Sequence, residues 1–304
     1  MELDFHTLDV FTDRRFAGNP LAVIHGADGL DTAAMQTIAR EFNLSESVFV
    51  MKPDNPAHSA KIRIFTPAME LPFAGHPTVG TAVLLAELRA GEHTGDMDSL
   101  VVLEERIGTV RVGVKLHAGK AAFAEFDTPK LPEDAGPAPD TQLLAPAVGL
   151  EPSEIGFANH RPTHYSAGVP FTFLPVASLA VMARAELNAA HWAQAFGSSR
   201  AGKMSLYCRE TNASSSAFHV RVFAPAAGVA EDPATGSAAA AFAGVIHHFD
   251  GLRDGSHKQI IEQGFEMGRP SHIAVGMEVS GGKLTNVRIG GSAVRVSAGK
   301  VRVK

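Results

Sequence analysis

The hydrophobic pattern of the chain singles out two helical segments with almost no polar face. Residues 78–86 read TVGTAVLLA, and residues 236–246 read GSAAAAFAGVI, in which Ser237 is the one polar side chain. A helix that is apolar all round must be surrounded by protein. We therefore expect two central helices, each wrapped by strands, and Gly91 is a natural stop for the first of them.

Short apolar runs bounded by turn residues predict the strands that surround these helices. A surface helix is expected over residues 31–40, with Asp31 as its N-cap. The glycine pair at residues 290–291 is interpreted as a turn. Strands are expected at residues 8–11, 21–24, 47–51, 61–65, within 101–114, and at 171–176, 218–223, 283–289 and 293–303.

One stretch of the chain occurs twice. Residues 62–68 (IRIFTPA) recur as residues 220–226 (VRVFAPA), and residues 77–82 (PTVGTA) correspond to residues 233–238 (PATGSA). Two copies separated by half the chain do not make a solenoid, which needs about three or more short repeats. The repeat predicts two homologous α+β domains that face each other.

The Pro-rich segment 128–139 is typical of a surface linker between domains. We place the first domain at residues 1–130 and the second at residues 131–292. The strand expected at residues 293–304 is a candidate for returning to the first domain and completing it. The sequence pattern leaves that alternative open.

Composition excludes several classes of protein. The 304 residues carry a net charge of -5 and no Lys/Arg run, so no nucleic-acid partner is expected. The N-terminus lacks the features of a secretory signal, and no apolar stretch reaches the ~18 residues of a membrane span. A single cysteine, Cys208, fits a reducing compartment, and we expect a cytoplasmic protein with no membrane partner.

The starts of the two central helices carry the candidate chemistry. Proline is favoured at the first helical position, so Pro77 and Pro233 would make His76 and Asp232 the N-cap residues. Free N–H groups at helix starts attract an anion, for which a substrate carboxylate is the natural candidate. From local sequence alone, Asp232 is best explained as a simple N-cap, but His at one start and Asp at the other indicate an acid/base pocket.

Glu46 is a third candidate, because this carboxylate lies at the entry to an apolar strand. Burial there would raise its pKa toward the range useful for proton transfer, while the alternative is a solvent-facing strand end. Cys208 has no base beside it in sequence and is expected to be a buried structural residue. His247 and His248 lack the spacing of a zinc site, and no dinucleotide or P-loop fingerprint occurs, so no metal or cofactor is expected.

Taken together, the motifs resemble those of the PhzF-like phenazine-biosynthesis isomerase family. They occur in order along nearly the whole chain, at residues 10–13 (VFTD), 18–20 (GNP), 43–46 (NLSE), 65–80 (FTP through GHPTVG), 231–237 (EDPATGS) and 267–271 (MGRPS). The resemblance implies two diaminopimelate epimerase-like domains, each a strand-rich barrel around a central helix, with the active site in the cleft between them.

The resemblance also implies a cofactor-independent isomerase that moves a proton within a small carboxylate-bearing substrate. Glu46 would be the proton shuttle, with His76 and Asp232 as its catalytic partners. The substrate-binding residues would be Gly75, Thr235, Gly236 and Ser237. Family habit implies a homodimer.

The related epimerases use two opposed cysteines. Cys208 lies in neither helix-start motif, which excludes a two-thiol racemisation. Two alternatives to an isomerase remain. A non-catalytic carboxylate-binding protein that kept the cleft is the main competitor, and a purely structural role ranks after it. Retention of Glu46 together with His76 and Asp232 argues against a mere binder, which needs no proton shuttle.

Overall fold

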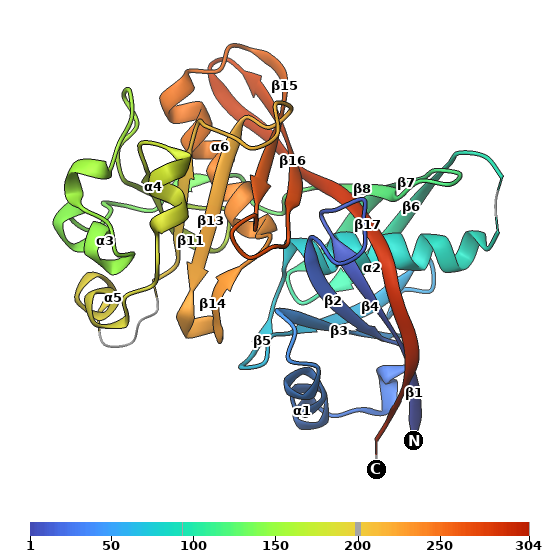
Figure 1. Cartoon of the computed structure of the whole chain (residues 1–304). Coiled ribbons are helices and arrows are strands. Elements are labelled where there is room, and N and C mark those ends of the chain that lie inside the picture. Colours follow the sequence, from blue (N-terminus) through green and yellow to red (C-terminus); the bar gives the residue numbers. More distant parts are fainter. Residues whose placement is uncertain (93, 198–201, 304) are drawn as a thin grey trace. The chain divides into compact units, whose positions relative to one another are not determined.

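The structure, a computed structural model, describes residues 1–92, 94–197 and 202–303. The chain divides into two compact units, which are described separately (Figure 1). The first comprises residues 1–127 together with the C-terminal segment from residue 289, and the second comprises residues 128–288. Lys304, the last residue of the strand expected at 293–304, lies outside the described residues.

The described residues of the first unit form two helices and a set of strands that follow the expected order. The helices are α1 (Thr32–Phe42) and α2 (Gly75–Ala90), with a 3-10 turn at Ala27–Gly29. The strands are β1 (Glu2–Val10), β2 (Asn19–Ile24), β3 (Glu46–Met51), β4 (Ala60–Phe65), β5 (Glu70–Leu71), β6 (Met97–Glu105), β7 (Gly108–Leu116), β8 (Ala122–Asp127) and the later part of β17 (Lys283–Arg302).

The strands of the first unit close into a barrel. Going round it, β1 pairs with β2, β2 with β3, β3 with β4, β4 with β6, β6 with β7, β7 with β8, and β8 with β17. The end of β17 then pairs antiparallel with β1, from Val10 opposite Ala293 to Glu2 opposite Arg302. The C-terminal strand is therefore an integral part of the barrel that the N-terminal strand begins.

Helix α2 lies inside this ring of strands and contacts β1, β2, β3, β6, β7 and β8 (Figure 1). Its residues are buried from Gly75 to Leu84, which explains why the segment has no polar face. Gly80 lets the helix approach the barrel wall, because a Cβ there would lie 2.6 Å from Leu21 and 2.7 Å from Val10. On the outside, α1 begins at the expected N-cap, where the Asp31 carboxylate accepts a hydrogen bond from Ala34 N at 2.7 Å.

The second unit repeats the strand order of the first and adds helices on its outer side. Its helices are α3 (Thr141–Ala147), α4 (Leu179–Arg184), α5 (Ala189–Phe196) and α6 (Gly236–Asp250), with 3-10 turns at Pro152–Glu154 and Pro225–Ala227. Its strands are β9 (Glu133–Asp134), β10 (Thr163–Ser166), β11 (Pro170–Pro175), β12 (Met204–Cys208), β13 (Phe218–Ala224), β14 (Val229–Asp232), β15 (Gly255–Gln263), β16 (Ser271–Ser280) and the start of β17.

The pairing directions confirm the duplication. In the first unit β1–β2 is antiparallel, β2–β3 parallel, β3–β4 antiparallel and β4–β6 parallel, and in the second β10–β11, β11–β12, β12–β13 and β13–β15 have the same four directions. Helix α6 corresponds to α2 and is buried along the same run of small residues. The predicted α+β class, with strand-rich units around central helices, is confirmed.

Two expectations for loops are wrong. Residues 283–302 form one strand, not two strands joined by a glycine turn. Gly290 continues the strand because its missing side chain makes room for β8, where a Cβ would lie 2.7 Å from Glu125 and 2.8 Å from the Ala124 carbonyl. The Pro-rich segment is only partly a linker, since β9 pairs with β10 and Pro132 packs near Gly244 of α6.

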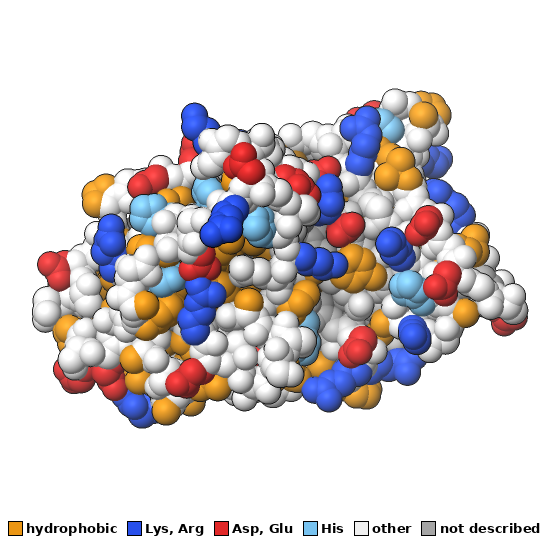
Figure 2. All heavy atoms as spheres, turned by 90° about the horizontal axis from the view of Figure 1, so that it is seen from above, with side chains coloured by type: hydrophobic (Ala, Val, Ile, Leu, Met, Phe, Trp, Pro, Cys, Tyr) orange, Lys and Arg blue, Asp and Glu red, His pale blue; other side chains and the backbone are white. Residues whose placement is uncertain are grey.

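Residues 141–196 contain three helices that the sequence pattern does not predict, namely α3, α4 and α5. These helices are short, and they pack around Trp192, which is fully buried in a cluster with apolar residues of β11 and β12. Segments of six to eight residues are too short for a clear helical period. On the face drawn in Figure 2, the described Lys and Arg side chains are interspersed with Asp and Glu.

Candidate functional site

Glu46 and His76 meet inside the first unit. Glu46 is the first residue of β3 and His76 is the second residue of α2. Glu46 Oε2 lies 3.2 Å from His76 Nδ1, and the two side chains are only 15% and 3% exposed. The alternative of a solvent-facing strand end for Glu46 is therefore wrong, because this carboxylate turns inward to a buried imidazole.

The strand β2 and the turn before it hold this pair in place. Glu46 lies opposite Leu21 in the parallel β2–β3 register. The preceding residue, Pro20, offers its carbonyl to His76. The turn that delivers Pro20 requires Gly18, whose φ is +65° and whose Cβ would lie 2.3 Å from the Val10 carbonyl. The motif at residues 18–20 thus serves the site through its backbone.

His76 is uncharged at neutral pH. Burial lowers the pKa of His76 to about 3, although the hydrogen bond with the Pro20 carbonyl acts in the opposite direction. A neutral imidazole has one N–H donor and one acceptor nitrogen. The site therefore places a carboxylate beside a neutral imidazole.

The candidate residues of the second unit gather where β14 leads into α6. Asp232 ends β14, Thr235 is the N-cap of α6, and Gly236 and Ser237 are its first two residues. Thr235 Oγ1 donates to Asp232 Oδ2 at 2.6 Å. Thr235 was predicted to bind substrate, but its hydroxyl is occupied by the neighbouring carboxylate.

The predicted N-cap positions are wrong at both central helices. Ala74, not His76, precedes α2, and Thr235, not Asp232, precedes α6. Both prolines lie elsewhere, since Pro77 is the third residue of α2 and Pro233 comes before α6 begins. Asp232 is thus not a helix cap.

The structure also changes the alignment of the repeat around these helices. A bidentate ion pair joins Arg63 to Glu70 in the first unit, and the same pair joins Arg221 to Glu231 in the second. Counted from these glutamates, Pro72 corresponds to Pro233, and His76 corresponds to Ser237. The pairing of strands agrees, since Phe65 lies opposite Glu70 and Phe223 opposite Glu231.

A difference in loop length explains the misalignment. The turn between β13 and β14 contains a 3-10 turn, Pro225–Ala227, so Arg221 and Glu231 are ten positions apart, whereas Arg63 and Glu70 are seven apart. An alignment of the two copies that is based on proline and glycine alone therefore pairs Pro233 with Pro77 instead of Pro72. In the corrected alignment each central helix begins with glycine, at Gly75 and Gly236, followed by the polar residue His76 or Ser237.

Sequence reasoning missed Gln263, the last residue of β15. This side chain is 1% exposed, and its amide contacts both Asp232 and Thr235. The sequence of β15, GSHKQIIEQ, is mostly polar, so no local pattern singles out Gln263. Glu105, a buried carboxyl at the end of β6, was also missed.

The turn after β15 makes a stability prediction. Gly264 has φ +78°, and a Cβ there would lie 2.5 Å from the Arg269 carbonyl and 2.6 Å from the Pro233 carbonyl. We expect Gly264→Ala to lower the free energy of unfolding by about 2–3 kcal/mol, because neither backbone group can move freely. Urea denaturation of the purified variant measures this loss.

Gly268→Ala is the matched control in the same turn. Gly268 also has a positive φ, +68°, but nothing lies within 4 Å of the added Cβ. Only the cost of the left-handed conformation remains there, about 1 kcal/mol. Equal losses in the two variants would contradict a role for the close backbone approach at Gly264.

The other candidates have structural surroundings. Cys208 is 1% exposed, and burial raises the pKa of its thiol to about 12, as expected for a structural cysteine. His247 and His248 lie in the last turn of α6. Within residues 1–92, 94–197 and 202–303, no group of three or more His, Cys, Asp or Glu is placed to hold a metal ion. None of the described helices is long and apolar enough to span a membrane.

Comparisons with solved structures define the class. The phenazine biosynthesis protein of the PhzF family from Bacillus anthracis superposes with a TM-score of 0.88 at 25% identity, covering 100% of both chains. A hydroxyproline epimerase from Agrobacterium vitis, 12% identical, shares the fold with a TM-score of 0.64, covering 99% of this chain and 92% of that one. The fold is that of the PhzF-like and epimerase-like proteins.

Comparisons of sequence identify the family. The model of the phenazine biosynthesis-like protein family, PhzC-PhzF, matches residues 8–299, and the chain belongs to this family. An uncharacterised isomerase of Mesorhizobium japonicum is 55% identical over 301 residues, covering 96% of each chain. The trans-2,3-dihydro-3-hydroxyanthranilate isomerase of Pseudomonas fluorescens is 36% identical over 296 residues, covering 97% of each. These relatives support an isomerase function.

Proposed function

We propose that this protein is an isomerase that moves a proton within a small carboxylate-bearing substrate by general acid/base catalysis, without a metal or cofactor. The observation that carries the proposal is the contact between Glu46 and the buried, neutral His76. Proton transfer by a positioned side chain is expected to accelerate such a reaction about 10²–10⁴-fold.

In the proposed mechanism, Glu46 removes a proton from a carbon next to a conjugated or carbonyl system. The hydrogen on this carboxyl group exchanges with solvent, and the group then returns a proton to another carbon on the same face. A single carboxylate suffices for both steps because the substrate anion is delocalised between them. His76, being neutral, has one N–H, which the Pro20 carbonyl accepts, and it does not deliver a second acidic proton.

The substrate carboxylate is proposed to bind against the starts of α2 and α6. The N–H groups at Gly75, Gly236 and Ser237 lie at these starts, where the helix dipole favours an anion. Asp232, held by Thr235, is proposed to face the substrate from the second unit.

Solvent-deuterium exchange tests the function directly. The relative named as trans-2,3-dihydro-3-hydroxyanthranilate isomerase suggests that compound as the first probe. Wild-type protein incubated with it in deuterium oxide is expected to place deuterium on a ring carbon, as followed by proton NMR. A panel of small unsaturated amino and hydroxy acids extends the screen.

The competing reading is a carboxylate-binding protein without catalysis. It predicts that calorimetry detects tight binding of a member of the panel while no member exchanges protons with solvent. That combination would overturn the proposed isomerase.

A further inference from the structure

The amide of Gln263 bridges the two residues that precede and cap α6. Its Nε2 donates to the Asp232 carbonyl at 2.7 Å and to Thr235 Oγ1 at 3.1 Å, and its Oε1 accepts from Thr235 N at 3.1 Å. A buried side chain with three hydrogen bonds to one turn restrains that turn strongly. Gln263 therefore holds the backbone from which the Asp232 carboxylate projects.

The donors and acceptors of this network require an amide. The Asp232 carbonyl accepts only from a donor, and Thr235 N donates only to an acceptor, so both ends of the Gln263 amide are determined. Since Nε2 donates to the Thr235 oxygen, the single hydroxyl hydrogen of Thr235 is left for Asp232 Oδ2, 2.6 Å away. The amide thus sets the direction of the hydrogen bond that Asp232 receives.

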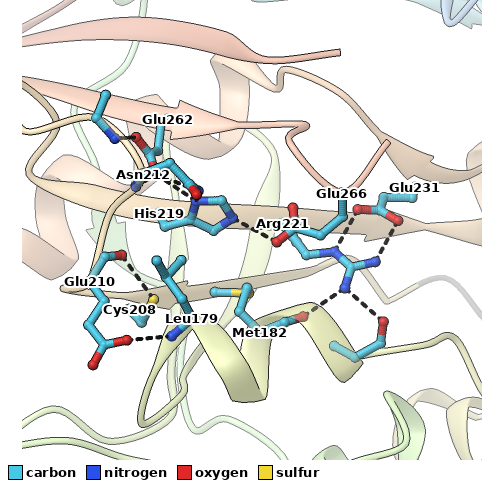
Figure 3. Close-up of polar contacts among 12 residues, drawn as sticks. Leu179, Met182, Cys208, Glu210, Asn212, His219, Arg221, Glu231, Glu262 and Glu266 are labelled. Carbon is cyan, nitrogen blue, oxygen red and sulfur yellow. Dashed lines mark hydrogen bonds and ion pairs between the residues drawn. The ribbon is translucent and has the colours of Figure 1, made fainter. Parts of the chain in front are cut away.

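Glu262, the residue before Gln263, anchors the end of β15 through the opposite face of the strand. Glu262, which is fully buried, accepts hydrogen bonds from the backbone N–H groups of Asn212 and Ala213 and lies 2.7 Å from His219 Nδ1 (Figure 3). Burial alone would lower the pKa of His219, but the contacts with Glu266 and Glu262 raise it above its usual value.

His219 also ties the turn after β15 to this anchor. Its Nε2 lies 2.9 Å from Glu266 Oε1, so one imidazole joins β13, β15 and the turn (Figure 3). Successive residues of a strand point to opposite faces, and Glu262 and Gln263 are therefore held from both sides. The backbone of β15 at Gln263 is therefore held in one position.

From this geometry we infer that Gln263 is a positioning residue, which orients the Asp232 carboxylate and the first turn of α6 toward the substrate. The inference rests on the proposed function, because it concerns the site where that reaction would occur. No contact between Gln263 and the substrate is required. Its action passes through Thr235 and Asp232.

The substitution Gln263→Glu provides the sharpest test, because it keeps the shape and removes the donor. An ionised carboxylate would face the Asp232 carbonyl and would take the Thr235 hydroxyl hydrogen away from Asp232. With trans-2,3-dihydro-3-hydroxyanthranilate, we expect kcat to fall about 10–100-fold at pH 8 with a smaller change in KM. At pH 5.5 a protonated carboxyl again has a donor, and the deficit is expected to shrink severalfold.

Three further variants serve as controls for Gln263→Glu. Gln259→Glu makes the same chemical change on the same strand, away from Asp232, and is expected to show no pH-dependent deficit. Thr235→Val removes the hydroxyl bond to Asp232 and should reproduce the fall in kcat, whereas Thr235→Ser keeps a hydroxyl and should lose much less of kcat. If Gln263→Glu fails to fold, this threonine pair decides: equal activity of the two variants would overturn the inference.

Failure of the inference differs visibly from failure of the proposed function. A wild-type protein that exchanges no proton contradicts the function itself. Wild-type kcat in Gln263→Glu at both pH values, or an equal deficit at both, contradicts only the role of Gln263. A crystal structure of that variant at pH 8 decides without turnover, since an unchanged bond between Thr235 Oγ1 and Asp232 Oδ2 would also overturn the inference.

Discussion

Replacing Glu46 with glutamine is expected to reduce proton exchange by about 10²–10⁴-fold while leaving substrate binding nearly unchanged. The amide has the shape of the carboxyl group and still reaches His76, which lies 3.2 Å from Glu46 Oε2. It has no basic oxygen with which to remove a proton. Deuterium incorporation, followed by NMR against calorimetric binding of the same probe, measures the two effects separately.

Glu41→Gln is the control for this substitution. Glu41 is exposed on α1, away from His76. Its replacement makes the same change in net charge as Glu46→Gln. It is expected to exchange protons at the wild-type rate. Wild-type exchange in Glu46→Gln would contradict the assignment of Glu46 as the proton shuttle.

Glu105 is expected to make the stability of the protein fall as the pH rises. This carboxyl is buried at the end of β6, and burial raises its pKa to about 8, although a hydrogen bond with Thr78 acts in the opposite direction. Thr78 Oγ1 lies 2.7 Å from Glu105 Oε1 and 2.9 Å from the Ala74 carbonyl. The single hydroxyl hydrogen of Thr78 serves one acceptor at a time. When Thr78 donates to the Ala74 carbonyl, a protonated Glu105 can donate to Thr78 Oγ1.

The sign of the effect follows from the raised pKa. The folded state holds the Glu105 proton between the usual value of 4.5 and about 8, where the unfolded chain has lost it. The stability contributed by this proton is complete below pH 4.5 and is lost as the pH rises to about 8. Between pH 6 and pH 9 the free energy of unfolding is expected to drop by about 2–3 kcal/mol more in wild type than in Glu105→Gln.

The adjacent Glu104 provides the control for the pH dependence. Backbone N–H groups of Asn55 and Asp54 lower the pKa of Glu104, so its stabilising effect is present above its usual pKa and is lost toward acid. Glu104→Gln should therefore keep the alkaline decline that Glu105→Gln removes. Urea denaturation at a series of pH values decides, and parallel curves for wild type and Glu105→Gln would contradict a buried proton.

Much of the fold follows from local patterns in the sequence. The apolar segments at residues 78–86 and 236–246 predict buried central helices, because a helix without a polar face has no stable surface position. The repeat predicts a duplicated architecture, and the strand pairings confirm it. The short helices of the second unit were not predicted, since their packing on Trp192 depends on strands that are distant in sequence.

The candidate site was predictable in its residues but not in its contacts. Glu46 and His76 stand out by type and place, yet their contact depends on how α2 lies inside the barrel. The correspondence of His76 with Asp232 was wrong because a longer turn shifts the second copy. The structure relates His76 to Ser237 through the pairs Arg63–Glu70 and Arg221–Glu231.

The sequence by itself determined the family motifs, the two buried helices and the residue types available for proton transfer, since each depends on local order along the chain. Tertiary structure alone decided that β17 closes the first barrel, that His76 is neutral, that Glu105 is buried, and that Gln263 holds the turn at Asp232. The physical reason is that pairing, burial and side-chain hydrogen bonds depend on groups brought together from distant positions.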